Sequence, residues 1–189
     1  MKSFALVLLT LLVPIAGSRQ TAAPAATANS AAVAEFSIPG HGKLRMPLPT
    51  GWKIESSPLA QPPAVKLHFA PPSSDSFDMQ VTAVWLDSDK LAKESPSFIH
   101  VTVHKTGEND IPHAVEKTLF VQDFRGPQSY GSYFSLTDND PGPGYPYMVQ
   151  GIFLTGPALA PFTILTRAPN APEVAQALSS FTNATFVNE

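Results

Sequence analysis

The stretch YPYMVQGIFLTGPALAPFTILT, residues 145–166, decides the fold because it contains two long strand patterns joined by a tight turn. Large apolar and β-branched residues fill Tyr145–Leu154 and Leu159–Thr166, and Thr155-Gly156-Pro157 separates them. Two such runs around a short Gly/Pro link predict an antiparallel β-hairpin. Pro161 cannot donate a backbone hydrogen bond, so it predicts an edge strand or a bulge.

Similar short strand patterns recur along the rest of the chain, and most of the links between them are short. The predicted strands are 36–38 and 43–46 around a Pro39–Gly42 turn, 65–69, 78–86, 115–122 and 132–136. Alternation of apolar and polar residues marks most of these segments as half-buried strands. Because parallel strands need long crossover links, the sheet is expected to be mainly antiparallel.

A helix is predicted to begin at Ser95-Pro96, with serine as the N-cap and proline in the first turn. Phe98, Ile99, Thr102 and Val103 fall on one side at helical spacing, and Gly107 is expected to end the helix. The β-branched residues within 99–103 leave a strand as the alternative.

A second helix is predicted near the C-terminus, after the sequence Asn170-Ala171-Pro172-Glu173. Val174, Ala177, Leu178 and Phe181 form its apolar stripe. The predicted fold class is therefore α+β, a mainly antiparallel β-sheet packed against a middle helix and a C-terminal helix.

The N-terminus carries the pattern of a secretory signal. Lys2 precedes a short apolar run, Phe4–Val13, which ends at Pro14 and the small residues 16–18. We expect residues 1–18 to be a signal peptide cleaved after Ser18, with Gly17 as the nearest alternative. An uncleaved anchor is the other interpretation, but a bilayer-spanning helix needs roughly 20 apolar residues.

Residues 19–33 are small, polar or prolyl and are expected to be a flexible tether, with a helix as the alternative because alanine is frequent. A single domain is predicted over residues 34–189, long enough to bury a core of its own. Lys2 and Arg19 are the only charged residues before Ala34, so this domain carries 10 Lys and Arg against 15 Asp and Glu. The acidic balance argues against nucleic acid as a partner.

The chain contains no cysteine, which excludes thiol catalysis, thiolate metal sites and disulfides. We expect a periplasmic or secreted location because of the signal pattern, no stable membrane insertion after cleavage, and a monomer. Trp52 and Trp85 lie in apolar patterns and are expected to be structural.

The order of the predicted elements resembles the PsbP-like superfamily, in particular a subgroup of uncharacterised exported bacterial proteins. The matching residues are Pro49-Thr50-Gly51-Trp52, the ending 175–181, and the strands 131–134 and 162–165. The resemblance implies an antiparallel sheet between helices. Known members are mostly binding or assembly proteins, including an extrinsic photosystem subunit and a small-GTPase-binding protein, and they share no catalytic motif. Similarity of fold alone does not assign a function.

Two short motifs have the residue types of metal sites. His100 and His104 have the four-residue spacing of two zinc ligands on one helical face, but Val101 replaces the glutamate of a zinc-protease helix. Asp138-Asn139-Asp140 resembles the start of a calcium loop without its distal glutamate. We interpret the histidines as surface residues and the acidic segment as a solvated turn, and we expect no metal and no cofactor.

No catalytic signature is present either. A nucleophile needs a serine, a histidine and a carboxylate that meet in space, and no Gly-x-Ser-x-Gly motif occurs. The acidic residues 75, 78, 87 and 89 lie near predicted turns, where aspartate is a common capping residue. The sequence therefore predicts no catalytic residue.

Tyrosines beside Pro/Gly-rich loops are the remaining candidates for a site. Tyr130, Tyr145 and Tyr147 are predicted to contact a partner, although aromatic residues on strands more often belong to a core. The sequence thus favours an exported, non-enzymatic binding or assembly domain for an unknown protein or small ligand of the cell envelope. The alternative is a cofactor-free hydrolase with a non-contiguous site, which a buried cluster of histidine with aspartate or glutamate beneath a pocket would favour.

Overall fold

A computed structural model describes residues 32–72 and 74–188. The predicted signal peptide, 1–18, and the predicted tether up to residue 31 lie outside the described residues. Within the described ranges, no helix is long and apolar enough to span a membrane.

Ten strands and three α-helices make up the described part of the chain. The strands are β1 (Ala32–Ile38), β2 (Gly42–Leu48), β3 (Lys53–Leu59), β4 (Ala64–Ala70), β5 (Phe77–Trp85), β6 (Gln122–Arg125), β7 (Ser129–Thr137), β8 (Tyr147–Thr155), β9 (Ala158–Thr166) and β10 (Thr185–Asn188). The α-helices are α1 (Ser88–Leu91), α2 (Pro96–Asp110) and α3 (Pro172–Thr182), and the 3₁₀ turns are η1 (Ser74–Ser76) and η2 (Ile111–His113).

The strands form two antiparallel sheets. The larger has the order β3-β4-β5-β9-β8-β7-β6, and the smaller has the order β1-β2-β10. The hairpin predicted over 145–166 is confirmed as β8 and β9, the centre of the larger sheet. The α+β class, with its mainly antiparallel sheet, middle helix and C-terminal helix, is also confirmed.

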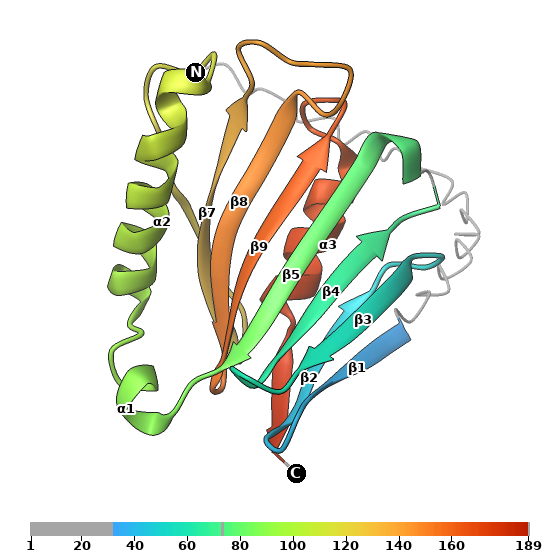
Figure 1. Ribbon diagram of the computed structural model, residues 1–189, viewed down its shortest axis with the longest axis vertical. Helices are drawn as coiled ribbons and strands as arrows, with labels where there is room; N and C mark the ends of the chain where they lie inside the picture. The colour runs from blue at the N-terminus through green and yellow to red at the C-terminus, as the bar shows by residue number, and fades with distance from the viewer. Residues whose placement is uncertain (1–31, 73, 189) are drawn as a thin grey trace, which may run out of the picture.

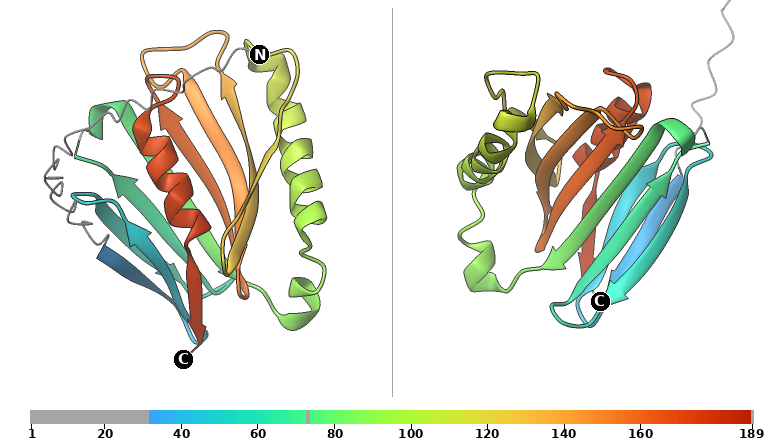
Figure 2. Two further views of the ribbon diagram at one scale, coloured as in Figure 1. Left: turned by 180° about the vertical axis from the view of Figure 1, so that it is seen from behind. Right: turned by 45° about the horizontal axis from the view of Figure 1, so that its top comes forward.

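The two faces of the large sheet are covered differently. Helix α3 and the small sheet pack on one face, which we call the back face, and enclose the main core. There Phe181 of α3 stacks on Phe153 of β8 with ring centroids 4.8 Å apart. Helix α2 lies on the opposite, front face, where Ile99 and Val103 pack against Phe134 of β7 (Figure 1). Figure 2 shows α2 and α3 on opposite sides of the sheet.

Helix α2 begins as predicted, because the Ser95 hydroxyl accepts a hydrogen bond from the Phe98 amide and Pro96 is the first helical residue. The prediction that Gly107 ends the helix is wrong, since α2 continues to Asp110. Gly107 is a buried residue in the last turn of α2, and Leu119 packs against it.

The strand predicted over 115–122 is also wrong. Residues 115–121 form an irregular segment, and only Gln122 belongs to β6. The segment is held by tertiary contacts: Leu119 and Val121 pack against the core beneath α2, and the Val115 amide donates to the Thr137 carbonyl. Packing under a helix thus replaces pairing with a neighbouring strand.

Pro161 lies in a central strand, not at an edge. The pairs Val81–Phe162 and Val84–Leu159 keep one register, so β9 has no bulge against β5. The ladder is interrupted only at Thr82 and Ala83, because proline lacks the N–H that pairing requires.

Three strands differ from the sequence expectations: one begins earlier than predicted, and two were not predicted. Strand β1 begins at Ala32, two residues before the predicted start of the domain. Strand β3 was missed because it is an edge strand that contains Pro58 and exposes most of its side chains. Strand β10 follows α3 within a few residues and pairs with β2, a partner far away in the sequence.

Candidate functional site

The front face of the large sheet is only partly covered. Helix α2 packs over β7 and β8, and in the described part of the chain no helix covers the front of β9, β5, β4 or β3 (Figure 1). Along these strands, alternate residues point to the back core, as Phe162 and Ile164 do on β9. The intervening side chains therefore project from the front face.

A row of hydrogen-bonding side chains runs straight across this face. Gln150 of β8 lies opposite Thr163 of β9, which lies opposite Gln80 of β5. The row continues through His68 of β4 to Glu55 of β3. We call these five residues the polar row. With strands about 4.8 Å apart, the row is roughly 19 Å long.

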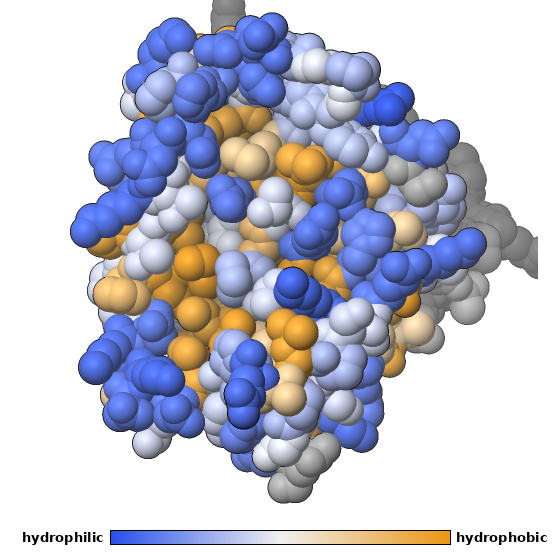
Figure 3. All heavy atoms as spheres, viewed as in Figure 1, coloured by the Kyte–Doolittle hydropathy of each residue, from blue (hydrophilic) through white to orange (hydrophobic). Residues whose placement is uncertain are grey.

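Apolar side chains line both sides of the polar row near its centre. Met148 and Leu165 are paired on one side, and Ile152 and Pro161 on the other. Figure 3 shows apolar residues gathered on this face between α2 and the central strands, with hydrophilic residues around them.

Three hollows on this face share lining residues, and we call them together the front trough. The central hollow, of about 310 Å³, lies over β5 and β9 and shares Gln80 and Thr82 with a hollow of about 460 Å³ over β3 and β4. A third hollow, of about 200 Å³, lies towards the C-terminal end of α2 and shares Leu165 with the central one. The trough therefore extends across most of the large sheet.

A hydrogen-bonded histidine–carboxylate pair lies in the front trough. His68 Nε2 is 2.6 Å from Asp78 Oδ1, joining neighbouring strands. The histidine side chain is 48% exposed and the aspartate side chain 25%. Asp78 lines the central hollow and His68 the hollow beside it, so the pair connects the two.

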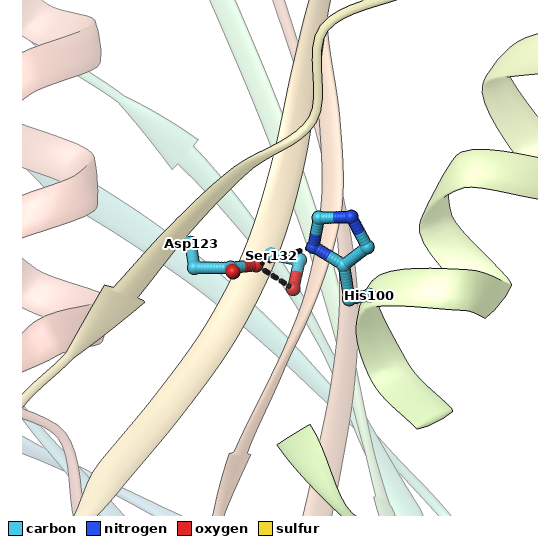
Figure 4. Close-up of polar contacts among 3 residues, drawn as sticks. All are labelled: His100, Asp123 and Ser132. Atoms are coloured by element: carbon cyan, nitrogen blue, oxygen red, sulfur yellow. Dashed lines mark hydrogen bonds and ion pairs between the residues drawn. The ribbon is translucent and has the colours of Figure 1, made fainter. Parts of the chain in front are cut away.

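A second polar cluster joins α2 to the edge of the sheet. His100 of α2 and Ser132 of β7 both contact the same carboxylate oxygen, Asp123 Oδ1 of β6, at 2.8 Å and 2.7 Å (Figure 4). These residue types are those of a hydrolytic triad, so the cluster bears directly on the hydrolase alternative.

The connectivity of this cluster does not suit nucleophilic catalysis. A nucleophilic serine gives its proton to histidine, while the carboxylate contacts the opposite side of the imidazole. Here the Ser132 hydroxyl donates to Asp123, and the carboxylate lies between serine and histidine. Ser132 is also only 2% exposed. The arrangement is a structural tie between α2, β6 and β7.

The contacts in this cluster lower the pKa of the Asp123 carboxyl group. Partial burial would raise the pKa of Asp123, but hydrogen bonds from Ser132 and His100, together with the charge of the imidazolium, lower it below its ordinary value. The ionised carboxylate is therefore favoured, as expected for an acceptor of two hydrogen bonds.

The three tyrosines predicted to bind a partner do not form one group. Tyr130 and Tyr147 lie at opposite ends of the paired strands β7 and β8. The Tyr130 hydroxyl donates to the Glu94 carbonyl, and burial raises the pKa of its phenol. Tyr145 lines the third hollow of the front trough, with Arg167 over its ring, 5.7 Å from the centroid. Of the three, Tyr145 lines the front trough.

Of the two motifs with metal-site residue types, His100 and His104 lie on α2, whereas Asp138 lines the third hollow of the front trough. His104 Nδ1 is 3.5 Å from Glu108, one turn further along α2, whereas His100 contacts Asp123. The Asp138 carboxylate accepts the Asp140 amide in a turn. Among residues 32–72 and 74–188, no three metal-ligating side chains of His, Cys, Asp or Glu gather.

Sequence reasoning missed the polar row. Alternation identifies Gln80, Gln150 and Thr163 as outward-facing residues of their strands. It does not show that these strands are neighbours in register, or that α2 stops short of them. An uncharged glutamine or threonine at several outward positions is the signal that could have drawn attention to this face.

Comparison with models of known protein families gave no match, and comparison with curated proteins gave none either. A search of solved structures found the solution structure of cyanobacterial PsbP (CyanoP) from Synechocystis sp. PCC 6803. The likeness has a TM-score of 0.48 and 11% sequence identity, and it covers 85% of this chain and 96% of that chain. The predicted PsbP-like resemblance agrees with this neighbour, but at this TM-score the likeness carries no argument about the family or the function of this chain.

Proposed function

We propose that this chain is an exported domain of the cell envelope that binds an extended polypeptide segment of a partner protein in the front trough, without catalysing a reaction. The observation that carries the proposal is the polar row, Gln150–Thr163–Gln80–His68–Glu55, which crosses five strands in register on an uncovered sheet face.

The dimensions of the row suit a polypeptide. Its length of roughly 19 Å equals about six residues of extended chain, at 3.3 Å per residue. A polypeptide backbone offers hydrogen-bond donors and acceptors in equal number, and amide and hydroxyl side chains such as Gln80 and Thr163 can satisfy both. Apolar residues beside the row, including Leu165 and Pro161, would contact the side chains of the bound segment.

The charge of the site favours the same class of partner. Among the described residues, Asp78 is the only charged side chain that lines the central hollow, and it is hydrogen-bonded to His68. Nucleic acids require concentrated positive charge, which neither this hollow nor the acidic composition of the domain provides. Export rests on the signal pattern of residues 1–18.

The proposal is tested by selecting a peptide display library against the purified, exported chain and measuring affinities by titration calorimetry. Thr163→Arg places a long charged side chain at the centre of the polar row. Thr118→Arg makes the same change at an exposed position outside the trough and is the matched control.

We expect selected peptides to bind the Thr118→Arg control like the unmodified chain and to bind Thr163→Arg at least about tenfold more weakly. Melting temperatures of both variants verify that they are folded. The proposal is overturned if no peptide is selected, if both variants bind equally well, or if a small molecule from a ligand screen occupies the trough and peptides do not.

A further inference from the structure

The contact between His68 and Asp78 in the front trough determines which imidazole nitrogen of His68 carries the proton. The Asp78 carboxylate oxygen lies 2.6 Å from Nε2 of His68. An ionised carboxylate only accepts hydrogen bonds, so Nε2 must carry the proton of this contact. In the neutral imidazole the other nitrogen, Nδ1, is then an acceptor.

This second nitrogen is available to a partner. The contact with Asp78 is the one side-chain hydrogen bond of His68 among the described residues, and the side chain is 48% exposed. His68 lies within the polar row, between Gln80 of β5 and Glu55 of β3. Nδ1 is therefore an unused acceptor within the trough.

We propose that His68 Nδ1 accepts a hydrogen bond from a backbone N–H of the bound polypeptide, and that protonation of His68 weakens the binding of the segment. This inference rests on the proposed function and assigns a specificity-determining residue to the same site. A protonated imidazole has two donors and no acceptor, so the contact would become N–H against N–H.

The charged residues around His68 are compatible with its protonation, and the polar row keeps its arrangement. Glu55 lies opposite His68 on β3, Asp78 contacts it from β5, and Lys66 lies two residues earlier on β4. The imidazolium would thus lie between two carboxylates. Protonation leaves the contact with Asp78 in place and reverses the role of Nδ1 alone.

Two variants distinguish the roles of the two imidazole nitrogens of His68. In His68→Asn the side-chain amide is near the position of Nδ1 and can supply an acceptor at any pH. In His68→Gln the amide reaches the position of Nε2, keeping the contact with Asp78 but losing the acceptor. A peptide selected on the unmodified chain and blocked by Thr163→Arg is titrated against each protein between pH 8 and pH 5, the range in which histidine changes charge.

We expect the unmodified chain to lose about three- to tenfold in affinity from pH 8 to pH 5, the effect of one hydrogen bond. His68→Asn should bind with nearly constant affinity throughout, and His68→Gln should bind about three- to tenfold more weakly at every pH. Nitrogen-15 NMR of the free chain at pH 8 should show the proton of His68 on Nε2.

The outcomes distinguish this inference from the proposed function. If no trough-dependent peptide is selected, both fail. If peptides bind the trough but the two His68 variants bind equally well, or if affinity does not change with pH, the role of His68 alone is wrong. A proton on Nδ1 in the NMR measurement also overturns it.

Discussion

Gly107 of α2 and Leu119 of the following segment lie so close that a Cβ on Gly107 would be 2.7 Å from Leu119 Cδ1. It would also be 3.0 Å from Cδ1 of Phe134, which is completely buried. The missing side chain thus lets the segment pack beneath α2. This contact explains why a glycine occurs inside α2, in its last turn, where a glycine is normally less favourable than alanine.

Gly107→Ala should therefore destabilise the protein, although alanine favours helices by about 1 kcal/mol over glycine. Overpacking against Leu119 and Phe134 costs about 1–3 kcal/mol, so we expect a net loss of about 1 kcal/mol in the free energy of unfolding. Urea denaturation measures this change. The control is Gly142→Ala, because in the described part of the chain no heavy atom beyond its chain neighbours lies within 4 Å of a Cβ there. A stabilised Gly107→Ala protein would show that Leu119 moves aside freely.

Trp52 and Trp85 are expected to contribute to stability rather than to binding. Trp52 packs edge-on against Phe77, with centroids 5.3 Å apart, and Trp85 stacks on His41 at 4.3 Å. Replacing either tryptophan by alanine should lower the free energy of unfolding by about 3 kcal/mol, at the lower end for large core residues because both are partly exposed. Chemical denaturation provides the measurement.

Phe120→Ala is the control for these aromatic truncations, since Phe120 is 74% exposed and its loss should be nearly neutral. If truncating either tryptophan proves as mild as truncating Phe120, that tryptophan is not structural.

Glu116 makes stability depend on pH. Its carboxylate accepts the Thr137 amide and hydroxyl, each at 2.8 Å, and so anchors the irregular segment to the end of β7. Burial alone would raise the pKa of Glu116, but these two hydrogen bonds and the Lys117 charge lower it. The stabilisation is therefore present above the unfolded value, about pH 4.3, and is lost as pH falls through the lower folded value.

We expect Glu116→Gln to lose about 1 kcal/mol of unfolding free energy at pH 7, a figure reduced for partial solvent exposure. The difference from the unmodified chain should shrink below pH 4. Denaturation at several pH values is the test, with Asp140→Asn, at an exposed loop position, as the control. A difference that stays constant down to pH 3 would show that ionisation of Glu116 is not responsible.

The signal pattern predicts that the mature chain begins at Arg19, or at Ser18 if cleavage follows Gly17. Intact-mass analysis of the exported protein measures the start directly. Lys2→Glu, which removes the positive charge before the apolar run, should reduce export, whereas Lys2→Arg should not. Exported material that still contains Met1 would contradict cleavage.

Local sequence patterns were sufficient for most of the fold. The hairpin of β8 and β9, the start of α2 at Ser95 and the stripe of α3 were all predicted, because turn residues, caps and periodicity act over a few neighbouring residues. The errors lie where segments far apart in the sequence pack against each other. Leu119 alternates like a strand residue, but it packs under α2.

The candidate site depended almost wholly on tertiary structure. Tyr145 was a candidate from the sequence because an aromatic residue stands beside a Pro/Gly-rich loop; it lines the third hollow of the front trough, and its role as a partner contact stays a prediction. His68 was not found, because its environment is made by strands β5 and β3, whose register against β4 no local pattern encodes.

The sequence by itself determined the strand and helix types, the antiparallel class of the sheet and the lack of thiol chemistry, since these follow from residue types and short-range spacing. Only the tertiary structure decided that α2 covers β7 and β8 and leaves the polar row open, and that Asp78 contacts Nε2 of His68. The physical reason is that packing and register are set by contacts between residues far apart in the chain.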